Sequence, residues 1–512
     1  MKHHYTSLFI LIFFPLIICA QTEISATIID SSALKPIPFA TIAFNKGSGV
    51  ISNENGQFQL IISRDLTEKD SLNFSCLGYD SKQLAALSIS DSLVYLQPKA
   101  IELNEVMLFN KNYTVEEIIE KAEAQIKTNY ETDYSKSKLF LRESYYTTMI
   151  KKEVKIKKST IPEFNQQFTD SLLNHFPNQS DYYNEILAEH YKSKTNTEDD
   201  ETEDKLNIIK ASHLYDKDSE ISFNAWEDKF NNIIKKRIKR DSYFKIKSGI
   251  FGTKEELDSS FYQDKENKNT EAYIEEQKKI EADKKKNFLK YRKQSINNLE
   301  HNSFFSEASD LNMLYKSNRY HFKLLDYSFL NNQYVYKIAF APKRSETYQG
   351  ILYINTEDFA VIRLEYTNVK SLKSIKFLGI SFNDYLKKGL LIYVKNASGT
   401  YSLQYAESEN AQKAGIDRPL KIIEKNKHVK GRRKQNEVAA DINFIISNSS
   451  KKQMVVFENT NITPSEFENF KEQANQKPVY LPAYDPEFWN GYNIIEPNQA
   501  IKDFKSLEAD NL

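Results

Sequence analysis

The residue types that most often carry catalysis or hold metal ions are few or scattered in this chain. None of the eight histidines has a Glu three positions later, and the sequence contains no H-E-x-x-H. A zinc peptidase site needs such a His–Glu spacing together with a more distant His. No Ser-His-Asp arrangement, phosphate-binding glycine loop or dinucleotide-binding glycine pattern is present. The sequence therefore predicts no catalytic residue, no metal ligand and no cofactor.

Four oxygen-bearing residues near the N-terminus, Asp30, Asn53, Glu54 and Asn55, raise the question of a calcium site. They lack the ordered spacing of an EF-hand loop, and tight turns use the same residue types for conformational reasons. We interpret them as turn residues. Cys76 lies in the apolar segment LNFSCLGY, which is typical of a buried small side chain rather than a reactive thiol.

Two segments carry side chains suited to binding. The basic run KKRIKR (235–240) suits anionic lipid or polysaccharide, but its place inside a helical pattern favours a solvated helix face. The C-terminal segment 476–512 is rich in aromatic residues and prolines. Such rings can stack on sugar or peptide, and more often they anchor a terminal segment to a core. The aromatic residues concerned are Tyr484, Phe488, Trp489 and Tyr492.

The clearest pattern in the chain, from Tyr334 to Thr367, predicts three antiparallel strands joined by two turns. The strands read YVYKIAF, ILYIN and AVIRLEYT, and in the third one apolar and polar side chains alternate, which places Arg363 on the solvent side. A period of two indicates one buried face, which we expect to point toward packed helices or toward a ligand. The candidate ligand-binding residues on that face are Tyr336, Phe340, Ile362, Leu364 and Tyr366.

Composition narrows the class of protein. A chain of 512 residues has room for about two to four domains. Lys and Arg together number 70, as do Asp and Glu, so no net charge attracts nucleic acid and none is expected as a partner. The abundant Tyr (31) and Phe (32) favour strands. No later segment has the roughly 18 uninterrupted apolar residues that a membrane-spanning helix requires.

Residues 1–20 have the organisation of a signal peptide. Lys2 precedes the apolar run Ser7 to Ile18, and Cys19-Ala20 supply short residues before Gln21. Cleavage after Ala20 is the favoured processing, and lipoprotein processing at Cys19 is the alternative, which the bulky Ile18 disfavours. We therefore expect an exported protein of the periplasm or the outer-membrane periphery. Removal of Cys19 would leave Cys76 alone, without a disulfide partner.

Residues 21–108 predict a small β-sandwich, because short strands recur there between turn signals such as Asn53-Glu54-Asn55-Gly56. The motifs Pro36-Ile-Pro38-Phe-Ala40, Asn53-Glu-Asn-Gly56-Gln-Phe58 and Leu77-Gly78-Tyr79 resemble the carboxypeptidase-regulatory-like domain of exported Bacteroidetes proteins. The segment Ile101 to Leu108 is similar to the exit strand of that family. The resemblance implies a transthyretin-like interaction module without peptidase activity.

The middle of the chain predicts helices. In 109–150, Thr114 and Glu117 form a capping-box pattern before an apolar stripe, and a strand follows at SKLFLRESYYTTMI. In 151–305 the charge rises and the strand patterns fade, with helical spacing around Trp226 and a charged loop at 194–205. We interpret 151–305 as a charged helical insertion between two strands of one sheet.

Residues 306–475 predict an antiparallel curved sheet, because strand patterns recur from His321 onward. The segments TYSLQYAE and PLKIIEKNKHV predict separate strands, as do AADINFIIS and QMVVFEN. The run from Tyr336 to Tyr366 resembles the region before the barrel in related outer-membrane proteins. More distantly it is similar to the half-barrel of periplasmic lipoprotein carriers. The expected fold class is mainly β with α in several domains: an N-terminal β-sandwich, then a half-barrel sheet with helices and a helical insertion.

Three functions remain open from the sequence. The first is a non-catalytic exported envelope protein with a β-sandwich interaction module and a half-barrel that binds an apolar or protein ligand. The second is a hydrolase of envelope polymers, which would need two carboxylates about 5–10 Å apart in a cleft. The third is a structural partner of an outer-membrane complex, with outer-membrane association but no transmembrane helix in the mature chain.

Overall fold

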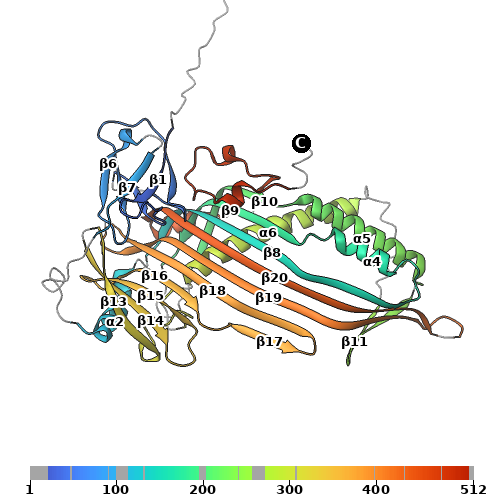
Figure 1. The fold of residues 1–512 in the computed structure, drawn as a ribbon. Coiled ribbons are helices and arrows are strands. Elements are labelled where there is room, and N and C mark those ends of the chain that lie inside the picture. Colours follow the sequence, from blue (N-terminus) through green and yellow to red (C-terminus); the bar gives the residue numbers. More distant parts are fainter. Residues whose placement is uncertain are drawn as a thin grey trace, which may run out of the picture.

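The computed structural model describes residues 21–45, 49–89, 92–99, 113–130, 133–194, 203–239, 241–256, 271–301, 303–305, 308–331, 333–396, 398–431, 433–473 and 476–506. The expected signal peptide, the exit strand at 101–108 and most of the charged loop at 194–205 lie outside these ranges. The chain is mainly β with α and contains several sheets, which confirms the expected fold class (Figure 1). No helix in the described ranges is both long and apolar enough to cross a membrane.

The N-terminal part forms two small sheets that face each other. The first has the order β4-β1-β7 and the second has the order β3-β2-β5-β6. Alternate residues of these strands point into a shared core, which includes Ile28, Ile42, Phe58 and Phe74. The strands are β1 (Thr22–Asp30), β2 (Thr41–Phe44), β3 (Gly49–Ile51), β4 (Gln57–Ile62), β5 (Ser71–Ser75), β6 (Lys82–Ala85) and β7 (Ser92–Leu96).

The rest of the described chain is built on one open sheet of fourteen strands. The main order is β13-β14-β15-β16-β18-β19-β20-β8-β9-β10-β21, with β17 paired to β18 and the β11–β12 hairpin paired to β19. All these pairs are antiparallel except β10 with β21. The strands are β8 (Ser135–Ser159), β9 (Gln179–Lys192), β10 (Asp204–Leu214), β11 (Ser242–Ser248), β12 (Phe251–Glu256), β13 (Tyr320–Leu330), β14 (Gln333–Pro342), β15 (Tyr348–Asn355), β16 (Val361–Asn368), β17 (Lys373–Phe377), β18 (Ile380–Lys395), β19 (Tyr401–Asn426), β20 (Lys434–Asn461) and β21 (Val479–Leu481).

The two faces of this sheet pack against different parts of the protein. On the helix face, Leu139, Leu141 and Ile186 pack in the main core against α2 (Val115–Ala124), α3 (Ile126–Asn129) and α6 (Glu271–His301). On the sandwich face, Phe140 and Leu187, one residue along from those side chains, join the core of the N-terminal sandwich. Because successive strand residues point to opposite faces, one stretch of β8 serves both cores. Figure 1 shows the sandwich and the C-terminal segment lying over the same end of the sheet.

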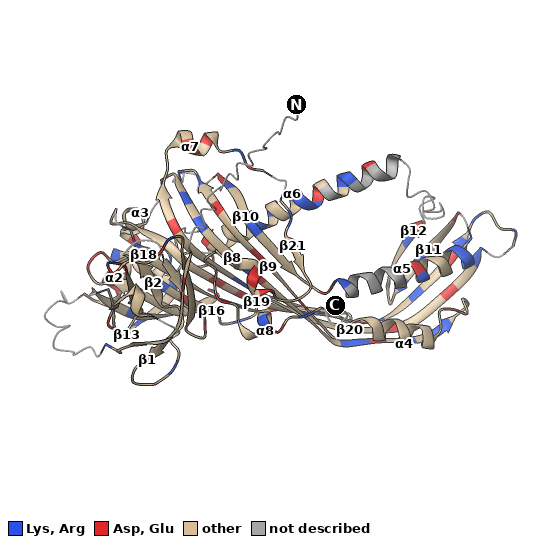
Figure 2. Cartoon of the chain, turned by 90° about the horizontal axis from the view of Figure 1, so that it is seen from above, with Lys and Arg blue, Asp and Glu red and all other residues tan. Residues whose placement is uncertain are grey.

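The long strands β8, β19 and β20 extend from the sandwich to a distal lobe (Figure 1). That lobe contains α4 (Gln166–His175), α5 (Lys217–Arg237) and the β11–β12 hairpin, around a small core that includes Ile161, Phe164 and Ile238. Figure 2 shows basic and acidic residues interspersed along these elements, in keeping with the balanced composition. The remaining helices are α7 (Pro464–Asn469) and α8 (Gln499–Lys502).

The prediction of a helical insertion at 151–305 was wrong in part. The region does contain α4, α5 and α6, but it also contains the end of β8 and all of β9, β10, β11 and β12. Strands β9 and β10 belong to the main sheet and bury Ile186, Ala188, Leu206 and Ile208 in its core. The sheet therefore begins at Ser135, and residues 306–475 supply only part of it.

The central meander has the predicted turns but not the simple alternation. A register shift between β15 and β16, where Tyr353 pairs with Arg363 and Ile354 pairs with Val361, makes Ile362 the extra residue of a β-bulge. As a result Val361 and Ile362 are both buried. Strands β19 and β20 are each continuous where the sequence indicated two shorter strands.

Candidate functional site

The candidate site lies where the N-terminal sandwich rests on the large sheet. The ring of Phe39 lies 5.1 Å from that of Tyr405, and Thr41 Oγ1 donates a 2.9 Å hydrogen bond to Gln404 Oε1. Farther along the contact, Lys451 Nζ lies 2.9 Å from a carboxylate oxygen of Glu54. These contacts fix the sandwich against β19 and β20, and they leave a cavity beside Thr41.

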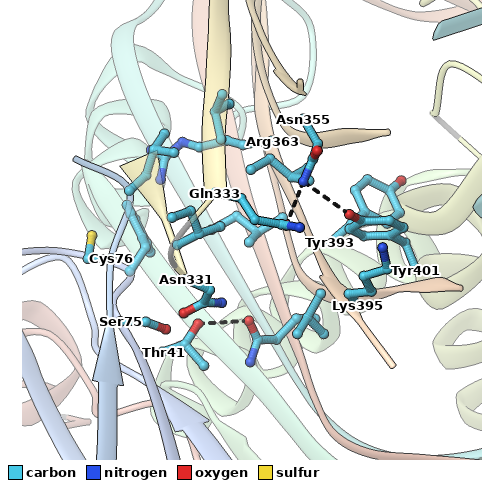
Figure 3. A pocket seen from close by; sticks show the side chains of 18 residues that line it. Thr41, Ser75, Cys76, Asn331, Gln333, Asn355, Arg363, Tyr393, Lys395 and Tyr401 are labelled. Atoms are coloured by element: carbon cyan, nitrogen blue, oxygen red, sulfur yellow. Dashed lines mark hydrogen bonds between the residues drawn. The ribbon is translucent and has the colours of Figure 1, made fainter. Parts of the chain in front are cut away.

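The cavity has a volume of about 310 Å³ and is lined by both parts of the protein (Figure 3). The sandwich contributes the loop before β2 and the end of β5 with the residues after it. The sheet contributes the β13–β14 turn, the bulge of β16, the end of β18 and the start of β19. The apolar part of the lining includes Phe39, Leu77, Val335, Ile362 and Ile392.

Polar groups of the cavity come mainly from the large sheet. Asn355 Nδ2 donates to Gln333 Oε1 at 2.7 Å, and a longer contact of 3.5 Å joins it to the hydroxyl of Tyr401 (Figure 3). Asn331 and Gln404 add two further side-chain amides to the lining. Amides both donate and accept hydrogen bonds, so this wall suits a ligand with hydroxyl, amide or carbonyl groups.

Two cations, Arg363 and Lys395, complete the lining, and both are ion-paired. Arg363 Nε lies 2.7 Å from Glu365 Oε1, while Lys395 Nζ lies 2.7 Å from Asp358 Oδ2. Their charge is therefore largely balanced by carboxylates beside the cavity. The residues that line the cavity include no Asp or Glu in the described part of the chain.

Cys76 also lines the cavity, but it is not poised to react. The side chain is buried, and burial raises the pKa of its thiol to about 11. A thiol with such a pKa stays protonated at neutral pH, and the thiolate is the nucleophilic form. The interpretation of Cys76 as a buried small side chain therefore agrees with its surroundings.

The five candidate ligand-binding residues are divided by the structure. Tyr336, Phe340, Leu364 and Tyr366 lie in the main core, each at most 5% exposed, in one cluster with apolar residues of α2 and α6. Only Ile362 reaches the cavity. Arg363, Gln333 and Lys395 were not predicted. Alternation in the third strand places Arg363 on the solvent side, and no local pattern indicates a wall shared with residues near position 40.

The aromatic C-terminal segment packs against the sheet instead of forming an open platform. Trp489 is 4% exposed, its ring lies 5.2 Å from that of Phe140, and its Nε1 donates to Glu185 Oε2 at 2.8 Å. Glu185 in turn lies 2.6 Å from the guanidinium of Arg142, which donates to the backbone carbonyl of Ile495 at 2.9 Å. The segment is thus anchored by a buried ion pair.

Two buried carboxylates of the sheet, Glu185 and Glu143, do not form a hydrolytic pair. Glu185 faces the sandwich side with Arg142, whereas Glu143 faces the helix side, 2.5 Å from Arg292 of α6. A hydrolase needs both carboxylates in one cleft, and here the sheet separates them.

The residues considered for calcium have other partners. Asp30 Oδ1 accepts hydrogen bonds from the backbone N–H groups of Ser32 and Ala33. Asn53 Oδ1 accepts from the backbone of Asn55 and Gln57. Among the described residues, no group of three or more His, Cys, Asp or Glu side chains is arranged to hold a metal ion.

Comparisons with known proteins add little to this geometry. No family model matches the chain, and no curated protein matches it. Among solved structures, the chain is similar to a LolA superfamily protein from Nitrosomonas europaea, at 11% identity and a TM-score of 0.17, covering 69% of this chain and 96% of that one. It is also similar to a domain described as an outer membrane lipoprotein-sorting protein domain from Vibrio parahaemolyticus, at 9% identity and a TM-score of 0.19, covering 68% and 95%.

A third similar structure is the MucA/MucB complex of Pseudomonas aeruginosa, at 4% identity and a TM-score of 0.14, covering 64% of this chain and 92% of that one. TM-scores this low establish no common fold.

Proposed function

We propose that this chain is an exported, non-catalytic cell-envelope protein that binds a small, mainly apolar ligand in the cavity between its sandwich and its sheet. The observation that carries the proposal is the cavity itself, with an apolar lining from two separate parts of the chain and amide groups along one wall. A volume of about 310 Å³ is at the lower end of the range that small-molecule sites occupy.

The composition of the lining defines the ligand class. Phe39, Leu77 and Ile362 favour an aliphatic or aromatic group, while Gln333 and Asn331 favour one or two hydrogen-bonding groups. The cations of the lining are ion-paired, so a strongly anionic ligand would have to compete with Glu365 and Asp358. A neutral amphiphile or an apolar side chain of a partner protein fits these features best.

Export rests on the N-terminal sequence, in which a charged residue, an apolar run and short residues precede Gln21. We also propose that residues 21–108 act as an interaction module of the carboxypeptidase-regulatory-like type. The motifs Pro36 to Ala40 and Asn53 to Phe58 support this role. N-terminal sequencing of the protein from the envelope fraction is expected to find Gln21 first. Retention of Met1 would contradict export.

Binding can be tested with the neutral fluorescent probe 1-aminoanthracene and the mature full-length protein. Wild-type protein is expected to bind the probe saturably at one site. Val394→Trp places a large ring in the cavity and is expected to weaken binding at least about tenfold, the equivalent of about 1.4 kcal/mol.

A matched control is Val479→Trp, because Val479 is an exposed strand residue away from the cavity. This variant is expected to bind the probe as the wild type does. No saturable binding, or an equal effect of the two tryptophans, would refute the cavity as the binding site.

A further inference from the structure

Exposed apolar side chains are concentrated at one edge of the large sheet. Nine of the twenty large apolar side chains that are exposed in the described part of the chain lie in the β11–β12 turn or in residues 369–385 around the β17–β18 hairpin. The six nearest the two turns form what we call the edge patch. Its residues are Ile250, Phe251, Ile375, Phe377, Leu378 and Ile380.

The patch is prominent because its most exposed members lie at the turns. Ile250 is 84% exposed and Phe377 is 62% exposed. Contiguous exposed apolar side chains mark surfaces that bind a protein or a membrane. The β17–β18 turn has Leu378 and Gly379 at positive φ, 46° and 79°, as in the tight turns that connect hairpin strands. This geometry holds the apolar side chains at the tip of the hairpin.

Arg418 of β19 holds the two turns together. Strand β18 pairs with β19 up to Ile416, and β11 pairs with β19 from Lys421 onward, so the two hairpins meet turn to turn beside Arg418. The buried guanidinium of Arg418 donates to Ser248 Oγ at 2.7 Å, and it also donates to the backbone carbonyl of Leu378. The patch is therefore one preformed surface made of two hairpins.

Positive charge surrounds the patch. Residues 242–256 and 369–385 contain six lysines and three carboxylates, which gives an excess of three positive charges in a chain whose net charge is zero. Lys373 and Lys376 lie on β17 between the apolar side chains, and Lys247 lies next to the β11–β12 turn. Lysines that flank exposed apolar side chains are typical of protein surfaces that bind anionic lipid.

We propose that the edge patch docks this protein onto an anionic lipid surface, with the two turns inserted among the lipid headgroups. A partner strand would pair with the open edges of β17 and β12, but the most exposed side chains lie at the turns, which have no free edge to pair. Turn tips can enter a lipid interface without leaving a strand edge unpaired. This inference goes beyond the proposed function and does not depend on the cavity.

The test is flotation of the mature full-length protein with lipid vesicles. Wild-type protein is expected to float with vesicles of phosphatidylethanolamine and phosphatidylglycerol, and to float less with phosphatidylcholine alone or at high salt. The double variant Phe377→Ser/Leu378→Asn is expected to lose at least about tenfold in partitioning, because two inserted side chains become polar. Asn is used at 378 because it tolerates positive φ.

The matched control is Leu87→Ser, which removes an apolar side chain that is 57% exposed but lies in the sandwich, and it is expected to float as the wild type does. The variant Lys373→Glu/Lys376→Glu is expected to lose the preference for anionic lipid. Absence of wild-type flotation, or unchanged flotation of Phe377→Ser/Leu378→Asn, would refute the proposal.

The edge patch could instead bind a second copy of the chain, and sedimentation velocity without lipid tests this alternative. The wild type is expected to sediment as a monomer, and a dimer that disappears in Phe377→Ser/Leu378→Asn would overturn the lipid assignment. Val394→Trp should keep vesicle binding, and Phe377→Ser/Leu378→Asn should keep probe binding. The two proposals can thus fail separately.

Discussion

Replacing Arg142 with methionine is expected to release the C-terminal segment from the sheet. The side chains of Arg142 and Glu185 are each 2% exposed and lie 2.6 Å apart. Arg142 also donates to the backbone carbonyl of Ile495, and Glu185 accepts from Trp489 and Ser212. Methionine fills most of the same space without charge, so the substitution tests the ion pair and its backbone contact more than the packing.

The magnitude follows from what the substitution leaves behind. Glu185 keeps two neutral donors but loses its cation, and removal of one partner of a buried ion pair costs about 3–5 kcal/mol. The carbonyl of Ile495 loses its donor as well, and a buried acceptor without a partner costs about 1–3 kcal/mol. A loss of about 4–8 kcal/mol in the free energy of unfolding is therefore expected for Arg142→Met.

The assay is urea unfolding followed by Trp489 fluorescence, in a Trp226→Phe background that leaves a single tryptophan. The control is Lys157→Met, because the Lys157–Asp441 pair has a similar separation of 2.9 Å but is exposed, and exposed pairs contribute about 1 kcal/mol or less.

The double variant Arg142→Met/Glu185→Gln separates charge from packing, because the amide oxygen of Gln can still accept from Trp489 and Ser212. It is expected to recover most of the stability, because no buried charge then lacks a partner. The residual loss should be about 1–3 kcal/mol, from the carbonyl of Ile495. Equal effects of Arg142→Met and Lys157→Met would refute the buried anchor, and a double variant as unstable as Arg142→Met would mean that packing, not charge, sets the cost.

Two further predictions concern a close backbone approach and a buried titrating group. Gly350→Ala would place its Cβ 1.8 Å from the carbonyl oxygen of Glu365 and should lower the free energy of unfolding by at least about 3 kcal/mol, as measured by calorimetry. The control Gly252→Ala, whose Cβ has its nearest contact at 3.4 Å, should lower it little. Equal losses in the two variants would contradict the close approach of β15 to β16 at Gly350. Burial, with a smaller contribution from Arg292, lowers the pKa of His213 from 6.5 to about 4. Between these pH values the unfolded chain therefore binds a proton that the folded chain does not bind. Stability should fall by about 3 kcal/mol as the pH decreases through this window, and less in His213→Phe; parallel pH profiles would refute this assignment.

Local signals in the sequence predicted local structure well. Thr114 and Glu117 form the expected capping box, with Glu117 Oε2 accepting from the backbone N–H of Thr114 at 2.7 Å and Thr114 Oγ1 accepting from that of Glu117 at 3.2 Å. The helix that follows buries Ile118 and Ile119 as its apolar stripe indicated. Such signals involve residues within one turn of each other, so the sequence contains all the information that they need.

The sequence was misleading where strands are long and rich in charged residues. In the second half of β8, Lys151 to Lys158 surround Val154 and Ile156, and the density of charge hides a period of two. In β19, Pro419 indicated a break. The structure places Pro419 in the gap between the pairing partners β18 and β11, where that edge of β19 is free and no ladder bond to it is required.

The cavity was beyond sequence reasoning because its walls come from distant parts of the chain. Thr41 meets Gln404 only after the sandwich has docked on the sheet, and neither residue has an unusual local pattern. The bulge at Ile362 follows from the register of β15 and β16, which alternation alone does not specify. Arg363, placed on the solvent side by alternation, therefore lies in the cavity wall.

The pairing of β8 with β20 has a consequence for the order of events during synthesis. Ser135 pairs with Asn461 and Ser159 pairs with Val438, so β8 can pair with β20 only when most of the chain has been made. Long-range strand pairing folds slowly, since the entropy of closing the loop must be lost before contacts compensate for it. A ribosome-bound chain would thus keep its largest sheet incomplete until late. A chain that is threaded through a membrane before it folds, as we propose here, is one for which such a delay is an advantage.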